Sequence, residues 1–98
     1  MGNRTHISGF QKKIEEIYLE RDRARGLEGT TLWFVEEVGE LVRALRRGER
    51  KNLEEEFADA LAWLATLASL AGVDLEKAGW DKYGNGCPRC GASPCRCP

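Results

Sequence analysis

Apolar residues recur every three or four positions along most of the chain, which is the spacing of one face of an α-helix. The pattern predicts four helices, over residues 10–25, 32–47, 53–70 and 75–83. No stretch alternates apolar and polar residues as a half-buried strand would. The predicted fold class is therefore all-α, a bundle of about four helices.

Glycines and short polar residues mark the expected helix ends. Gly26, Gly48, Gly72 and Gly84 would end the four helices in turn. The expected N-caps are Thr30 or Thr31 for the second helix, Asn52 with a capping-box Glu55 for the third, and Asp74 for the fourth.

The third predicted helix is apolar on nearly every side, which indicates a helix that is buried all round. A chain of 98 residues leaves a large share of its surface exposed and is only marginally stable as a monomer. Three or four short helices cannot cover such a helix alone. We therefore expect the bundle to be completed by oligomerisation, as a homodimer or homotetramer.

Two short groups of acids are the main candidate chemistry. Glu36, Glu37 and Glu40 lie on the second predicted helix, and Glu56 and Asp59 lie on the third. Residues three or four apart share a helix face, so an antiparallel pair of helices would bring the groups together. Two carboxylates about 5 Å apart repel by roughly 3 kcal/mol at an effective dielectric of about 20.

A hard divalent cation, Mg²⁺ or Mn²⁺, would offset that repulsion through oxygen ligands. The alternative is that both groups are solvated faces of ordinary surface helices. Part of the acidity also has a structural explanation, because Glu54 and Glu55 would lie in the first turn of the third helix and complement its dipole.

Composition narrows the classes of partner. Fifteen basic and 16 acidic residues give a net charge of −1, which offers no long-range attraction to nucleic acid or to an anionic membrane. The longest apolar stretch, residues 60–71, is too short to span a bilayer. We expect a cytoplasmic protein, and we expect the single histidine, His6, to be exposed and to take no part in chemistry.

The end of the chain differs in composition from the rest. Its four cysteines are Cys87, Cys90, Cys95 and Cys97. Cys-x₂-Cys-Gly is the knuckle of many structural zinc sites, so the sequence predicts one Zn²⁺ held by four thiolates in a zinc-knuckle tail over residues 87–98, after an all-α domain over residues 1–86. A site shared between subunits, a redox pair and an iron–sulfur centre remain alternatives.

Three segments together resemble a known family. They are Trp33-Phe34-Val35-Glu36-Glu37-Val38-Gly39-Glu40-Leu41, Glu55-Glu56-Phe57-Ala58-Asp59-Ala60-Leu61 and Gly72-Val73-Asp74-Leu75. The pattern, EExxE followed by ExxD, resembles the MazG-like nucleotide pyrophosphohydrolases of the all-α NTP pyrophosphatase superfamily, over roughly residues 7–86. Either motif alone is weak, whereas the two in this order are fairly specific.

The resemblance implies a hydrolase that cleaves a nucleoside triphosphate between the α- and β-phosphates in the presence of Mg²⁺. It implies Glu37, Glu40, Glu56 and Asp59 as metal ligands. Glu36, the extra acid of the first group, could hold a second metal or the attacking water, and we assign it the role of the base. Lys82 and Asn85 loosely match substrate-binding residues of the family, although Asn85 could also be a helix C-cap and Lys82 ordinary solvated charge. Trp33 and Trp80 are candidates for stacking on a base, or else core residues.

The sequence thus favours a nucleotide pyrophosphohydrolase with catalytic Mg²⁺ or Mn²⁺ and structural Zn²⁺, in a role such as removal of non-canonical nucleotides. One alternative is a non-catalytic helical metal-binding protein whose zinc knuckle holds a partner. A zinc-dependent nucleic-acid binder is a third, against which the near-neutral charge argues. Nucleotide preference and the number of catalytic metals stay open.

Overall fold

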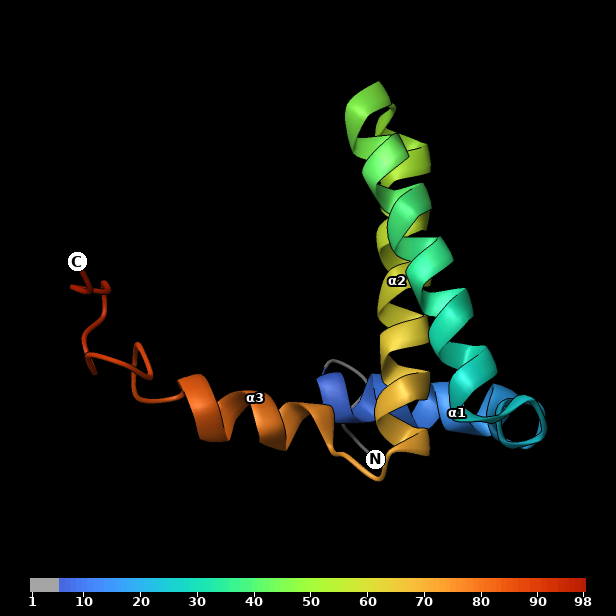
Figure 1. Ribbon diagram of the computed structural model, residues 1–98, viewed down its shortest axis with the longest axis horizontal. Coiled ribbons are helices and arrows are strands. Elements are labelled where there is room, and N and C mark those ends of the chain that lie inside the picture. The colour runs from blue at the N-terminus through green and yellow to red at the C-terminus, as the bar shows by residue number, and fades with distance from the viewer. Residues whose placement is uncertain (1–5) are drawn as a thin grey trace.

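The computed structural model describes residues 6–98 and contains three helices in that range (Figure 1). They are α1 (Ile7–Arg47), α2 (Arg50–Leu70) and α3 (Leu75–Tyr83). No strand occurs among the described residues, so the all-α prediction is confirmed. Residues 1–5 of the predicted helical domain lie outside the described part.

Helix α1 replaces the first two predicted helices. Gly26 interrupts it with a non-helical backbone at φ 86° and ψ 167°, a conformation open almost only to glycine. The helix resumes at once, so the predicted gap before residue 32 does not exist and a bundle of four separate helices is not seen. The Thr31 hydroxyl donates to the Leu27 carbonyl at 2.8 Å, so it does not cap a helix start.

The part of α1 after Gly26 pairs with α2 as a helical hairpin (Figure 1). Gly48 ends α1 in the left-handed conformation, and its N–H donates to the Ala44 carbonyl, as predicted. Helix α2 then begins at Arg50 with no side-chain cap. The predicted cap at Asn52 is therefore wrong, and Glu54 and Glu55 lie beyond the first turn.

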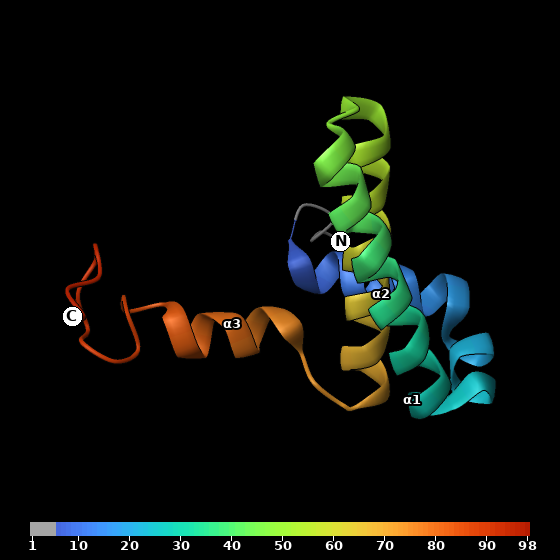
Figure 2. The ribbon, with the colours of Figure 1, turned by 45° about the horizontal axis from the view of Figure 1, so that its top comes forward.

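Helix α3 begins where the sequence predicted. The Asp74 carboxylate accepts a hydrogen bond from the Lys77 backbone N–H at 3.1 Å. Two contacts tie the start of α3 to the start of α1: Ser8 N–H donates to Glu76, and Leu75 N–H donates to the side chain of Gln11, both at 3.0 Å. From there α3 extends away from the hairpin, as Figures 1 and 2 both show.

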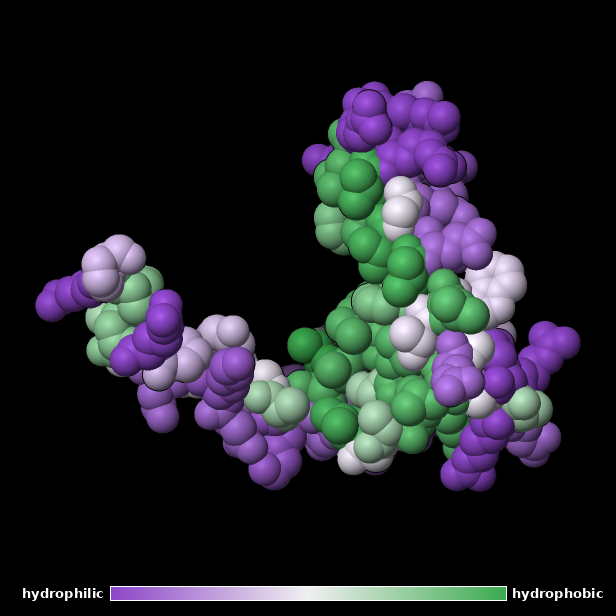
Figure 3. All heavy atoms as spheres, viewed as in Figure 1, coloured by the Kyte–Doolittle hydropathy of each residue, from purple (hydrophilic) through white to green (hydrophobic). Residues whose placement is uncertain are grey.

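The core of the single chain is small. Among the described residues, the fully buried apolar side chains are Ile14, Ala44, Ala65 and Ala68. Phe57 of α2 is 52% exposed, so one chain does not bury this helix on every side; its burial against another subunit stays a prediction. Apolar surface runs along the edge of the hairpin that faces α3 (Figure 3).

The dimensions of the molecule agree with a small core. Its radius of gyration is 15.6 Å, whereas a compact domain of this length has about 13 Å. Within the described residues, no single helix is long and apolar enough to cross a membrane, although α2 and α3 reach the required length and apolarity as a pair bent by 95°.

Candidate functional site

Three of the predicted metal ligands meet on the hairpin. Glu37 projects from α1, and Glu56 and Asp59 project from α2, one turn apart on the same face. One carboxylate oxygen from each residue lies within 4.8 Å of the other two. We call these three side chains the carboxylate cluster. It forms because the turn at Gly48 folds α2 back along α1.

The other two acids of the first group are placed differently. Glu40 lies outside the 4.8 Å cluster, but its charge still acts on Glu37 and on Glu56. Glu36 is exposed and is not part of the cluster. The role of Glu36 as a base stays a prediction.

Two oxygens of the carboxylate cluster are buried without a partner. They are Oε2 of Glu37 and Oε1 of Glu56, and neither accepts a hydrogen bond from the described residues. Buried carboxylate oxygens are normally hydrogen-bonded, because an unpaired one forfeits its hydration. Oxygen donors converging in this way are the ligand set that Mg²⁺ and Mn²⁺ prefer.

The pKa shifts at the cluster also favour a cation site. Burial raises the pKa of Glu37 above its ordinary value of 4.5, and the charges of Glu40, Asp59 and Glu56 raise it further, while the Trp63 side chain opposes the shift. Burial, with Glu40 and Asp59 next, also raises the pKa of Glu56. Both carboxyl groups are therefore harder to ionise than a free glutamate, and a bound cation would favour their charged forms.

Trp63 stands beside the cluster and was not singled out by the sequence. Its ring stacks on Trp33, with centroids 6.0 Å apart and planes at 12°, and the Arg25 guanidinium lies 4.9 Å from its centroid on the ring face. Its position beside the cluster could have been predicted from the sequence, because Trp63 follows Asp59 by four residues and so shares its helix face. Trp33, predicted from the sequence to be a base-stacking or core residue, is thus half exposed and stacked on Trp63.

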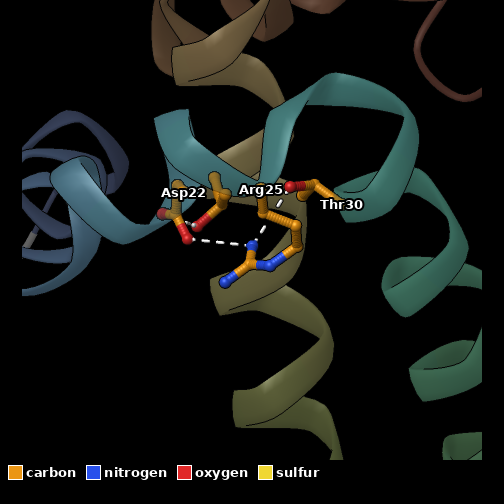
Figure 4. A network of polar contacts seen from close by, with 4 residues as sticks. Asp22, Arg25 and Thr30 are labelled. Carbon is orange, nitrogen blue, oxygen red and sulfur yellow. Dashed lines mark hydrogen bonds and ion pairs between the residues drawn. The ribbon is translucent and has the colours of Figure 1, made fainter.

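A buried polar network holds Arg25 in place (Figure 4). Its Nη1 donates to Asp22 at 3.0 Å and to the Thr30 hydroxyl at 3.1 Å, across the break at Gly26. The Thr66 hydroxyl of α2 donates to the second oxygen of Asp22 at 3.1 Å. The network therefore ties both parts of α1 to α2.

A cavity of about 240 Å³ opens between this network and the cluster. Asp59 belongs to both the cluster and the cavity wall. The rest of the wall contains two aromatic rings and two arginines, together with apolar, acidic and hydroxyl side chains: Tyr18, Trp63, Arg21, Arg25, Ile14, Ala62, Asp22 and Thr66. Such a site offers stacking surfaces and hydrogen-bond donors next to the candidate metal ligands.

The structure does not bring the predicted substrate-binding residues of the C-terminal region to the cluster. Lys82 and Asn85 are exposed at the end of α3 and just beyond it. Since α3 extends away from the hairpin, neither meets the carboxylates within one chain (Figure 2). Trp80, on the same helix, is 69% exposed, so it belongs to no core of this chain.

The four cysteines of the tail come together as a second candidate site. Their sulfur atoms lie within 4.8 Å of one another, and all four are free thiols. The backbone N–H groups of Cys90 and Arg89 lower the pKa of Cys87 to about 6, whereas contacts with Cys95, Cys87 and Cys90 raise the pKa of Cys97 to about 11. His6 is exposed, as expected.

Comparison with known proteins agrees with this arrangement. The family model of the MazG nucleotide pyrophosphohydrolase domain matches residues 25–90, well over half of the chain. The matched segment contains the whole carboxylate cluster together with Arg25 and Trp63. No curated protein matches the chain. Sequence motif, helical hairpin and family model converge, and the chain belongs to the MazG nucleotide pyrophosphohydrolase domain family.

Proposed function

We propose that this chain is a nucleoside triphosphate pyrophosphohydrolase that depends on Mg²⁺ or Mn²⁺ and releases a monophosphate and pyrophosphate. The family supports a hydrolase acting on nucleotides. The observation that carries the proposal is the pair of buried, unpartnered oxygens of Glu37 and Glu56 beside Asp59. If these acids were only the solvated faces of ordinary surface helices, both oxygens would be exposed to water.

The residues present fit a divalent cation. Glu37, Glu56 and Asp59 would hold it, and Glu40 adds negative charge close by. Their donors are all carboxylate oxygens, which suit Mg²⁺ and Mn²⁺ and disfavour softer metals. When bound, the ion supplies positive charge that neutralises phosphate oxygens and lowers the pKa of a water molecule.

The protein itself contributes position and surroundings. The cavity beside Asp59 is the proposed place of the nucleoside, with the Trp63 ring as part of its wall and the fixed guanidinium of Arg25 as a donor to the base or to a phosphate. Because Arg25 is already held by Asp22 and Thr30, it loses little freedom when a substrate binds. Cleavage between the α- and β-phosphates requires the α-phosphate to lie next to the cluster.

The proposed substrates are ribo- and deoxyribonucleoside triphosphates, both canonical and non-canonical. The test is a screen of canonical and modified triphosphates with Mg²⁺, in which monophosphate and pyrophosphate are both measured. Equal amounts of the two products are expected, since cleavage at the α-phosphate yields one of each.

Two variants assign the activity to the cluster. Glu37→Gln and Asp59→Asn are expected to lower kcat/KM by about 100-fold or more, as loss of a major electrostatic element of an active site does. Glu54→Gln is the matched control, because Glu54 is an exposed glutamate of α2 outside the cluster. Its activity should equal that of the wild type.

The result that would overturn the proposal is absence of pyrophosphate release from every triphosphate, with well-folded protein and added Mg²⁺ or Mn²⁺. The chain would then be a non-catalytic helical protein that uses the cluster to bind an ion. Release of single phosphate groups in place of pyrophosphate would refute the site of cleavage.

A further inference from the structure

The tail that follows α3 has a defined path without a core of its own. Residues 84–98 contain no helix or strand, and none of them is fully buried. Two backbone hydrogen bonds close a loop that contains Cys87 and Cys90: Gly91 N–H donates to the Cys87 carbonyl at 2.7 Å, and Cys87 N–H donates to the Ala92 carbonyl at 3.0 Å. Too little apolar surface is buried here to offset the entropy of ordering the segment. Something else must hold it.

The sulfur atoms have the spacing of a single tetrahedral metal site. Sγ of Cys87 lies 3.6 Å from Sγ of Cys97 and 3.6 Å from Sγ of Cys95, and Cys90 and Cys95 are 4.0 Å apart. A tetrahedron with Zn–S bonds of about 2.3 Å has sulfur atoms about 3.8 Å apart. The observed distances bracket this value.

Backbone N–H groups point at the sulfurs as they do around thiolate ligands. Arg96 N–H donates to Cys90 Sγ at 3.2 Å, and Cys97 N–H donates to Cys95 Sγ at 3.3 Å. Donors of this kind favour the anionic form of sulfur and fix its orientation. Backbone N–H groups of residues 96 and 97 therefore already surround the sulfurs as they would at a metal site.

The geometry argues against a disulfide and against a site shared between subunits. A disulfide requires sulfurs about 2.05 Å apart, and all four thiols are free at 3.6 Å or more. A site shared between subunits needs fewer than four ligands from one chain, whereas here one chain supplies a complete tetrahedral set. Four closely spaced sulfurs also leave no position open for a substrate.

We propose that Cys87, Cys90, Cys95 and Cys97 bind one Zn²⁺ per chain as a closed tetrathiolate, which folds the tail and is separate from the carboxylate cluster. Binding forms four Zn–S bonds, and each thiol that is protonated beforehand releases its proton to solvent. No electron is transferred. The site uses sulfur from the tail, the cluster uses oxygen from the hairpin, and α3 separates the two (Figure 1).

The experiment uses the full chain, stripped of metal with a chelator under reducing conditions and then titrated with Zn²⁺ or with Co²⁺. Elemental analysis and native mass spectrometry are expected to give one zinc per chain. Co²⁺ should produce sulfur-to-metal charge-transfer absorption, which Zn²⁺ then abolishes. Carboxylate ligands give no such band, so the carboxylate cluster cannot mimic this result.

Two variants test the ligand set. Cys97→Ser and Cys90→Ser each remove one thiolate and should weaken Zn²⁺ binding by on the order of 100-fold or more, while Ser93→Ala, in the same tail, should bind as the wild type does. Helical circular dichroism separates local loss of the site from global unfolding, because no hydrogen bond or ion pair joins residues 84–98 to the described part of α1 or to α2.

Half a zinc per chain would refute the closed single-chain site in favour of one shared by two subunits. Iron in place of zinc, disulfide bonds in protein kept under reducing conditions, or absence of thiolate absorption with Co²⁺ would also overturn the proposal. The outcome is independent of the pyrophosphohydrolase assay, since zinc content is measured without substrate.

Discussion

At the scale of single residues, Glu37 and Glu56 hold a position that is unfavourable without a cation. Burial and neighbouring acids raise the pKa of both carboxyl groups above 4.5. In the absence of metal, the folded state therefore binds protons more tightly than the unfolded state. The resulting stabilisation is present below pH 4.5 and is lost as the pH rises through the raised pKa of each group.

The sign of this effect leads to a prediction for Glu37→Gln. At pH 7 the metal-free variant should melt a few degrees above the metal-free wild type, because a neutral amide carries no charge to repel its neighbours. Mg²⁺ at 100 times its dissociation constant should stabilise the wild type by about 2.7 kcal/mol and the variant by much less. Thermal melts with and without Mg²⁺ at pH 7 and pH 5 measure both effects. A variant that is less stable than the metal-free wild type at pH 7 would contradict the prediction.

Gly86 is the residue on which closure of the tail depends. Its φ is 106°, and a Cβ there would lie 3.0 Å from the Gly91 carbonyl oxygen and 3.2 Å from that of Ala92. Gly86→Ala is therefore expected to weaken Zn²⁺ binding by about 10-fold or more, given strain of about 1–3 kcal/mol for such a backbone. Gly79→Ala, where a Cβ meets nothing within 4 Å, is the control in a competition titration with a chromogenic chelator. Equal zinc affinity in the two variants would count against the closed loop.

At the scale of elements, the break in α1 decides what lies beside the carboxylate cluster. Gly26 turns the first part of α1 across the hairpin, and the turn places Arg25 between Asp22 and Thr30 (Figure 4). Arg25 then reaches the ring of Trp63 on α2. A straight helix of the same sequence would not form this network.

We expect Gly26→Ala to destabilise the fold by about 1–3 kcal/mol, because an L-residue with a side chain rarely adopts φ 86° with ψ 167°. Gly39→Ala lies within the helical part of α1, has free space around its Cβ, and should be neutral or slightly stabilising. Urea denaturation followed by circular dichroism gives both values. If Gly26→Ala were as stable as Gly39→Ala, the break would not be a structural requirement.

At the scale of the whole molecule, one chain leaves much of its apolar surface uncovered. The exposed apolar side chains of the hairpin include Val38, Val42, Leu45, Phe57, Leu61 and Leu64. They lie on the same helices as the carboxylate cluster. The predicted self-association as a homodimer or homotetramer is still a prediction, and this surface is the part of the chain that would carry it.

Sedimentation equilibrium at micromolar concentration is expected to give a mass of two or four chains. Phe57→Glu and Leu61→Glu should shift the distribution to smaller species, because a buried charge without a partner is unfavourable in an apolar interface. Lys12→Glu, at an exposed site on the first part of α1, is the control for added negative charge; it lowers the net charge by two, against one for each apolar substitution. A wild-type chain that is monomeric and folded across this range would contradict the prediction.

Much of the local structure was predictable because it depends on neighbours in sequence. Helical periodicity, the left-handed Gly48 and the cap at Asp74 follow from interactions within one or two turns. The predicted N-caps at Asn52 and Thr31 were wrong, because both residues lie inside a helix that has already begun. The short spacing of the cysteines also confined them to one small loop.

The sequence by itself determined an all-α chain, two acidic helix faces and a compact cysteine loop, since each depends on residues a few positions apart. Only the tertiary structure decided which acids meet and which aromatic stands beside them. Glu37 joins Glu56 and Asp59, while Glu40 lies outside and Lys82 is carried away on α3. The physical reason is that contacts between helices depend on the direction that each helix takes after a glycine. The periodicity of apolar residues within a helix does not predict that direction.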